Sequence, residues 1–242
     1  MTKGDYVKTY EKELLNELKA LPAFQKIKVK EKESLIDALF SFLKSLLPEE
    51  KLVIQILYNS PNPLSVKQIR KKYAIFMAIK SFELTLKLSW IKSKYQQRFG
   101  KKLLPSGNNL GKFIQMAFLE PSIRNFFETF KEKEIESLIS FLNKNLPEKI
   151  PSYYKLKGIL EYLESIGVVN KRELTGRKAE TVWFLSPIFS KICSSIISFI
   201  ERENNKRPIT SIEKEVYFLI TGRFPQKTIK IEDILKPKKS GD

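Results

Sequence analysis

Few side chains in this chain of 242 residues belong to the types that carry out chemistry. Histidine is absent and Cys193 is the single cysteine, which excludes most zinc sites, intrachain disulfides and histidine-activated nucleophiles. The closest carboxylates are Glu132, Glu134 and Glu136, but Glu132 and Glu136 stack on one helix face among lysines. We therefore predict a protein that is not an enzyme and uses no metal or cofactor.

A glycine-containing loop at 104–111 is the remaining motif with a chemical interpretation. Gly107 and the pair Gly111-Lys112 are partly similar to a phosphate-binding loop. Their spacing is wrong, however, and Phe113 stands where serine or threonine is required. Nucleotide binding is thus rejected, and the segment is predicted to be a loop between two halves of the chain.

The net charge of +17 is concentrated in one part of the sequence. Residues 51–115 carry 13 basic side chains and one acidic side chain, Glu83. A concentrated excess of this kind favours a polyanionic partner such as nucleic acid. A solvated basic face is the alternative interpretation.

Two predicted helices carry most of this basic charge. A capping box at 65–68 begins the first helix, whose candidate DNA contacts are Lys67, Arg70 and Lys71. Residues 74–98 are predicted to form one long helix. A basic stripe that would follow a phosphate backbone runs along it, formed by Lys80, Lys87, Lys94 and Arg98. An amphipathic helix with a solvated side explains the same pattern.

The segment 151–187 has the clearest local signals. Apolar residues at helical spacing predict a helix over 152–166, and Gly167 is suited to end it. Alternating and aromatic residues predict two strands at 168–174 and 181–186, joined by a polar turn. The segment is therefore expected to be a helix followed by a β-hairpin.

This succession of helix, Gly-Val-Val, basic hairpin with Gly-Arg at its tip and aromatic return strand resembles the winged helix-turn-helix superfamily. In that superfamily the helix before the hairpin enters the major groove of DNA, and the hairpin is the wing. The resemblance takes the helices expected at 112–130 and 132–145 as the two that precede the recognition helix. The turn at 145–151 departs from the pattern, because it is longer and richer in proline than usual.

The resemblance implies which residues meet DNA. A helix of about 10–12 Å diameter fits the major groove, and Leu156, Leu160 and Leu163 would anchor its inner face. The candidate contacts on the recognition helix are Ser152, Tyr154, Lys155, Lys157, Gly158 and Glu161. The candidate contacts on the wing are Lys171, Arg172, Arg177 and Lys178.

Gly158 and two aromatic residues have structural interpretations beside the functional one. Glycine weakens a helix by roughly 0.5–1 kcal/mol relative to alanine, so Gly158 calls for an explanation. Close approach to DNA is one explanation, and tight helix packing is the other. Trp183 and Phe184 are interpreted as the core and the edge of the wing.

The predicted fold is mainly α-helical, with a small β-hairpin wing. We expect a strongly basic helical domain at 1–104, a winged-helix domain at 112–203, and a C-terminal helix with a basic tail at 204–242. A second, divergent winged helix in the first of these stays an open alternative, because no residue string repeats between the halves.

The expected function is site-specific recognition of double-stranded DNA, for replication initiation or transcription regulation. A chain of tandem winged-helix units without a ligand domain is similar to archaeal winged-helix replication initiators and, equally, to small archaeal regulators. The composition, rich in Lys, Ile and Glu, fits an archaeon or its plasmid or virus. The alternative is a module that docks a partner from those machineries and binds nucleic acid without sequence preference. Leucine-rich helices at 5–20 and 188–203 either form a homodimer interface or close the core. No apolar run reaches the roughly 18 residues of a membrane span, so no membrane partner and a cytoplasmic location are expected.

Overall fold

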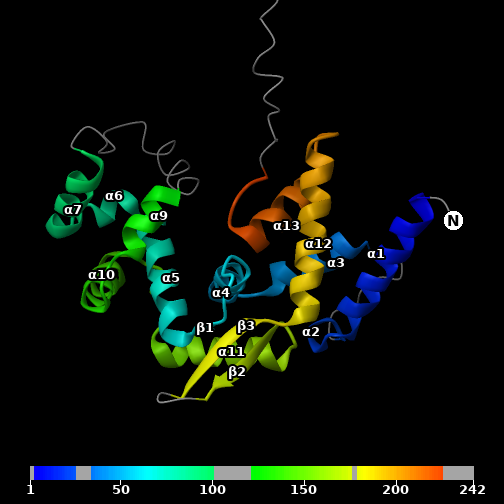
Figure 1. The fold of residues 1–242 in the computed structure, drawn as a ribbon, viewed down its shortest axis with the longest axis horizontal. Coiled ribbons are helices and arrows are strands. Elements are labelled where there is room, and N and C mark those ends of the chain that lie inside the picture. The colour runs from blue at the N-terminus through cyan, green and yellow to red at the C-terminus, as the bar shows by residue number, and fades with distance from the viewer. Residues whose placement is uncertain (1–2, 26–33, 101–120, 176–178, 226–242) are drawn as a thin grey trace, which may run out of the picture. The chain divides into compact units, whose positions relative to one another are not determined.

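The computed structural model describes residues 3–25, 34–100, 121–175 and 179–225. These residues form helices and one small antiparallel sheet, which confirms the expected mainly helical class (Figure 1). The chain divides into two compact units, of which one contains Met1–Ser45 with Pro187–Asp242 and the other contains Leu46–Ser186. Each unit is described separately below.

The first unit consists of α1 (Lys3–Ala20), α2 (Pro22–Gln25), α3 (Leu35–Ser45), α12 (Pro187–Asn204) and α13 (Ser211–Thr221). α12 packs against α1 and α13, and α13 packs against α3. Leu39 and Ile192 are among the fully buried residues between these helices. Cys193 is also buried, as expected for a small apolar residue, and desolvation raises the pKa of its thiol.

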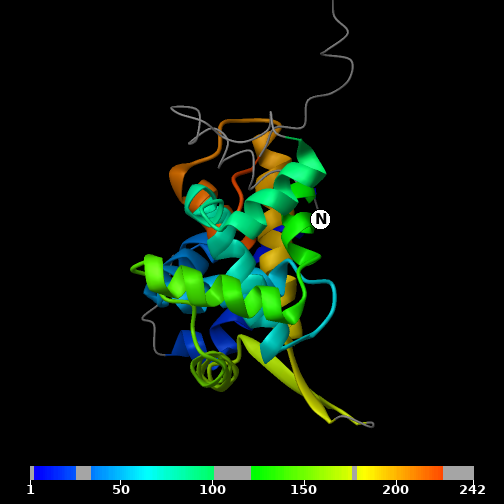
Figure 2. The same ribbon diagram turned by 90° about the vertical axis from the view of Figure 1, so that its left-hand side faces the viewer.

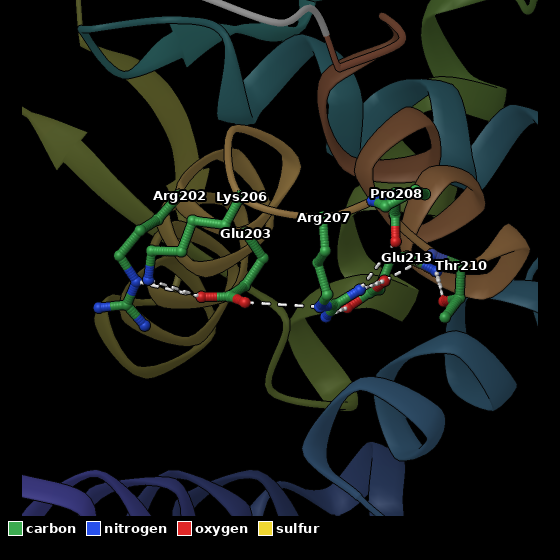
Figure 3. A network of polar contacts seen from close by, with 7 residues as sticks. All are labelled: Arg202, Glu203, Lys206, Arg207, Pro208, Thr210 and Glu213. Carbon is green, nitrogen blue, oxygen red and sulfur yellow. Dashed lines mark hydrogen bonds and ion pairs between the residues drawn. The ribbon is translucent and has the colours of Figure 1, made fainter.

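A network of ion pairs and hydrogen bonds holds the turn between α12 and α13 (Figure 3). The Arg207 guanidinium donates to both carboxylate oxygens of Glu213, at 2.7 and 3.1 Å, and lies 3.4 Å from Glu203. Glu213 also accepts from the Thr210 N–H at 2.6 Å, while the Thr210 hydroxyl accepts from the Glu213 N–H at 3.2 Å. This capping box begins α13. The hydrogen bond from Arg207 lowers the pKa of Glu213 to about 2, although burial opposes the shift.

The second unit contains α4 (Pro48–Tyr58), β1 (Leu64–Ser65), α5 (Val66–Lys80), α6 (Phe82–Thr85), α7 (Ser89–Phe99), α9 (Pro121–Glu128), α10 (Glu132–Asn145), α11 (Tyr153–Ser165), β2 (Val169–Leu174) and β3 (Glu180–Leu185). The expected helix and hairpin within 151–187 are confirmed. α5 is central to this unit, because α4, α9, α10 and α11 all pack against it. The expected boundary near 104–112 falls within the sequence range of this unit.

The sheet of this unit has the strand order β1-β3-β2, with both pairings antiparallel. The two-residue strand β1 places Leu64 opposite Trp183 and Ser65 opposite Val182. On the other side of β3, Lys171 lies opposite Trp183. Directly opposite residues of a ladder point to the same face, so Leu64, Trp183 and Lys171 share one face of the sheet. Figure 2 shows the β2–β3 hairpin extending away from the helices of this unit.

The single long helix expected over 74–98 is wrong. α5 ends at Lys80, and the chain continues as the separate helices α6 and α7. At the break, the Thr85 hydroxyl donates to the carbonyl of Ser81 at 3.0 Å. Phe82 directly after the break is fully buried, in contact with aromatic rings of α7 and α9. Burial of this large side chain favours the break over a continuous helix.

The Glu213 network predicts acid sensitivity of the first unit. A carboxyl whose pKa is lowered by folding stabilises the folded state at pH values above its pKa in the unfolded chain, which is near 4.5. This stabilisation is lost as the pH falls towards 2, the pKa in the folded state. We expect Glu213→Gln to lower the free energy of unfolding at pH 7 by on the order of 2 kcal/mol, and so to lower the melting temperature. The variant's stability should also depend less on pH between about 4.5 and about 2. Circular dichroism melts of both proteins at several pH values measure this. Equal midpoints at pH 7 would contradict the role of the network.

Candidate nucleic-acid interface

α11 is held with one face inward and the opposite face outward. Leu156, Leu160 and Leu163 are fully buried, as the spacing predicts. α11 packs through this side against α4, α5 and β2. At its start, the Ser152 hydroxyl accepts from the Lys155 N–H at 3.2 Å, so Ser152 acts as the N-cap. This cap fixes the first turn of α11, and with it the direction in which the outward face points.

The end of α11 leads directly into the hairpin. Gly167 has a φ of 78°, the left-handed conformation that glycine adopts without a steric penalty. The Val168 N–H donates to the carbonyl of Leu163 at 3.0 Å, and the Gly167 N–H to that of Glu164 at 2.9 Å, which together form a Schellman motif. Ser186 closes the base of the hairpin by donating from its N–H to the Val168 carbonyl at 2.9 Å. These bonds set where the hairpin leaves the helix.

The outward face of α11 carries a glycine between two exposed tyrosines. Tyr154 is 83% exposed and Tyr162 is 47% exposed. Gly158 lies midway between them at helical spacing, and a Cβ built at this position meets nothing within 4 Å. Tight helix packing therefore does not explain Gly158. The position is open, so close approach of DNA stays a hypothesis for this glycine.

Charged residues of α11 already have partners in the second unit. Lys155 donates to Glu49 of α4 at 2.6 Å, and this hydrogen bond lowers the pKa of the Glu49 carboxyl. Lys155 thus ties α11 to α4 instead of standing alone as a candidate DNA contact. Lys157 and Glu161 lie 3.7 Å apart on the outward side, as an exposed pair that costs little to open.

The candidate wing residues fall into three groups. Lys171 donates to Glu164 at 2.9 Å, which raises the pKa of its ammonium group, and lies 5.7 Å from the centre of the Trp183 ring. Arg172 is exposed on β2. Arg177 and Lys178 lie outside the described residues. Trp183 is buried, as expected for the core of the wing, and Phe184 is half-buried.

The basic residues of α5 and α7 face an acidic helix. Arg70 lies 2.6 Å from Glu136, and Lys67 lies 3.8 Å from Glu132. Lys94 pairs with Glu134 and lowers the pKa of that carboxyl. Lys71 of α5 donates to the Glu128 and Phe130 carbonyls. The remaining cations of the stripe have other surroundings: Lys80 pairs with Glu148, Lys87 is exposed in the turn after α6, and Arg98 lies against the Phe99 ring. The charge excess of 51–115 is therefore partly neutralised by its own unit.

A groove of about 450 Å³ lies between the start of α5, the outward side of α11 and the hairpin. Its charged lining consists of Lys67, Lys157, Lys171, Glu161, Glu173 and Glu180. Its most buried lining residue is Trp183, at 1% exposure. The sequence alone did not single out this groove, because its walls come from segments more than 80 residues apart.

Comparison of the chain with protein-family models, curated proteins and solved structures found no match. Within the part of the chain that the structure describes, no cluster of acidic, cysteine or histidine residues is placed to hold a metal ion. In the same residues, no helix combines the length and the apolar character that crossing a membrane requires.

The ion pairs change what the basic stripe is expected to do. Replacing Lys80 and Lys94 by alanine removes cations that glutamates of α10 and of the turn after it already neutralise. These two lysines are therefore expected to release few counterions from DNA on binding. We expect the salt dependence of duplex binding to keep its slope to within about one after this double substitution. Titrations at several salt concentrations measure the slope. A decrease by about two would show that both lysines contact phosphates.

Proposed function

We propose that Leu46–Ser186 is a winged-helix-type unit that binds double-stranded DNA, with α11 in the major groove and the β2–β3 hairpin against the adjacent backbone. The observation that carries the proposal is the pairing of β3 with both β2 and β1. This pairing joins the hairpin after α11 to a strand that directly precedes α5, and α5 packs against α11. The helices α5 and α11, the β2–β3 hairpin and the short strand β1 therefore form one assembly, from which one face of α11 points outward.

In this proposal the helices before the recognition helix are α4 and α5, and not the expected pair at 112–130 and 132–145. The reason is that β1, which completes the sheet, lies between α4 and α5 in the chain. Residues 81–152 are then an insertion between α5 and α11. Its acidic helix α10 covers basic residues of α5 and α7, which leaves the outward face of α11 and the hairpin as the surface for DNA.

The exposed chemistry of α11 supports major-groove contact. Tyr154 offers a hydroxyl and an apolar ring, and Lys157 with Glu161 offers a donor and an acceptor for base edges. The open position at Gly158 lets a groove edge approach the helix backbone. Side chains of this kind favour site-specific binding, as in transcription regulation or replication initiation, over purely electrostatic attachment.

A second candidate function is a protein-interaction module. Exposed tyrosines are enriched at protein interfaces, and Tyr154 and Tyr162 fit that composition. The internal pairing of the α5 and α7 cations also reduces the charge available for phosphates. A partner from a replication or transcription assembly would then contact the same face of α11.

Selection of bound sequences from a random duplex library at about 150 mM salt distinguishes the two functions. The proposal predicts an enriched motif, and the symmetry of that motif reports whether one copy or two copies bind. Retention of all sequences alike would favour the interaction module with nonspecific binding. No retention at all would overturn the DNA-binding proposal.

Substitutions on the outward face locate the binding surface. We expect Lys157→Ala combined with Arg172→Ala to weaken binding to the selected duplex by roughly tenfold to a hundredfold, through lost base and phosphate contacts. Lys133→Ala, an exposed lysine of α10, is the matched control and is expected to change affinity little. Fluorescence anisotropy titrations measure both. Equal affinities for the double variant and the control would place DNA elsewhere.

The substitution Gly158→Ala is expected to change folding stability and DNA affinity in opposite directions. Alanine fits the open space and favours the helix, so stability is expected to rise by about 0.5–1 kcal/mol. Affinity for the selected duplex is expected to fall at the same time, because a methyl group enters the space that the groove edge approaches. Denaturant unfolding and duplex titration measure the two effects. Unchanged affinity would mean that no ligand approaches this notch.

A further inference from the structure

A second groove, in the first unit, takes no part in the proposed function. This α1–α12 groove has a volume of about 710 Å³ and lies between α1, the start of α3, α12 and the start of α13. Its described lining residues all belong to the first unit. The volume falls within the range of roughly 300–1,000 Å³ that is typical of small-molecule sites.

The groove is open because short side chains of α12 line it. Ser194 and Ser198 lie one helical turn apart on α12, and both are exposed. α1 runs antiparallel to α12 (Figure 1), and the ion pair of Lys191 with Glu17, at 2.8 Å, joins the two helices. The apolar lining residues are Leu14, Leu35, Ile36, Ile196 and Phe199. Ile36 and Phe199 are only half-buried, so an apolar ligand would cover surface that water now contacts.

Two of the three charged residues among the described lining already have partners. Arg202 Nε lies 3.7 Å from a Glu203 carboxylate oxygen (Figure 3). The buried Glu213 carboxylate accepts two hydrogen bonds from the Arg207 guanidinium, at 2.7 and 3.1 Å. An anionic ligand would therefore meet a guanidinium whose charge is shared with Glu203, and lining carboxylates of its own sign. Like charges repel, so this lining disfavours an anion.

The third charged lining residue, Glu11 of α1, differs from the other two. Its side chain is exposed, and it forms no ion pair with any residue that the structure describes. A cation beside this carboxylate would gain an opposite charge while one side of it stays in water, so its desolvation costs little. The charge of the groove thus matches a ligand with an apolar body and a positively charged head group.

We propose that the α1–α12 groove binds a small amphiphilic amine, with its apolar body against Ile36 and Phe199 and its ammonium group beside Glu11. The hydroxyls of Ser194 and Ser198 line the same groove and are of a type that accepts hydrogen bonds from an ammonium group. The site concerns the first unit alone and does not depend on the proposed DNA binding. The net charge of the chain, +17, attracts anions in general, so a preference for a cation has to come from the groove itself.

Three ligands that share one apolar chain test the charge preference. We titrate the full chain at neutral pH with decylamine, decanol and decanoate, each below its micelle concentration, by isothermal titration calorimetry. One decylamine is expected to bind per chain, roughly threefold to fivefold more tightly than decanol, and decanoate is expected to bind most weakly. Decanoate affinity equal to or above that of decylamine would overturn the proposal. Binding of many molecules without saturation would overturn it as well.

Glu11→Gln removes the charge and keeps the size of the side chain. Decylamine affinity is expected to fall roughly threefold to fivefold, while decanol affinity stays unchanged because decanol carries no charge. Glu13→Gln is the matched control, since Glu13 is exposed on the same helix but does not line the groove. If Glu11→Gln and Glu13→Gln bind decylamine equally well, the ammonium group does not lie beside Glu11.

Ser198→Trp fills the groove from an exposed position. This variant is expected to lose saturable binding of both decylamine and decanol, whereas Ser140→Trp, at an exposed serine of α10, is expected to retain it. Circular dichroism verifies that both variants fold. Retained binding by folded Ser198→Trp would overturn the site. Sedimentation velocity tests a second copy of the chain as the occupant: the proposal predicts the same mass with and without decylamine, and a dimer that Ser198→Trp dissociates would overturn it in favour of a dimer interface.

Discussion

The arrangement of the second unit depends on two backbone pairings, Leu64 with Trp183 and Ser65 with Val182. They bridge more than a hundred residues of chain and complete the sheet beside the hairpin. Ser65 belongs at the same time to β1 and to the N-cap of α5, where its hydroxyl accepts from the Gln68 N–H at 3.4 Å. The direction of α5 is thus tied to the hairpin. Because α11 packs on α5 and runs into β2, one short strand positions α11, the β2–β3 hairpin and the groove between them.

The charged side chains of this unit fall into two sets. One set forms ion pairs within the unit, and the other remains available for a partner. The acidic residues of α10 pair with three basic residues of α5 and α7, which neutralises part of the charge that the sequence concentrates in 51–115. Exposed pairs of this type contribute little stability each, so their main effect is to lower the net positive charge of α5 and α7. The outward face of α11 and the hairpin keep exposed tyrosines, an open glycine and weakly held lysines.

Local signals predicted the local structure of this chain well. The Ser65–Gln68 capping box, the leucine face of α11, the stop at Gly167 and the two strands of the hairpin all follow from short-range rules, and the structure contains each of them. Long-range features were out of reach. The ion pair of Arg70 with Glu136 and the pairing of β1 with β3 join residues far apart in sequence, and nothing in a composition or a period specifies them. The break after Lys80 was missed for a related reason, since it depends on burial of Phe82 against rings from α7 and α9.

The proposed function depends on contact between the outward face of α11 and duplex DNA. Photo-crosslinking tests it most directly, with a benzophenone amino acid in place of Tyr154 on α11 and, in a second protein, in place of Gln97 on the basic helix α7. Both positions are exposed, so each probe reaches a ligand that binds at its own surface. Crosslinks to the selected duplex are expected from position 154 and not from position 97. Crosslinks from position 97 alone would contradict contact through α11, and would place DNA on the basic stripe.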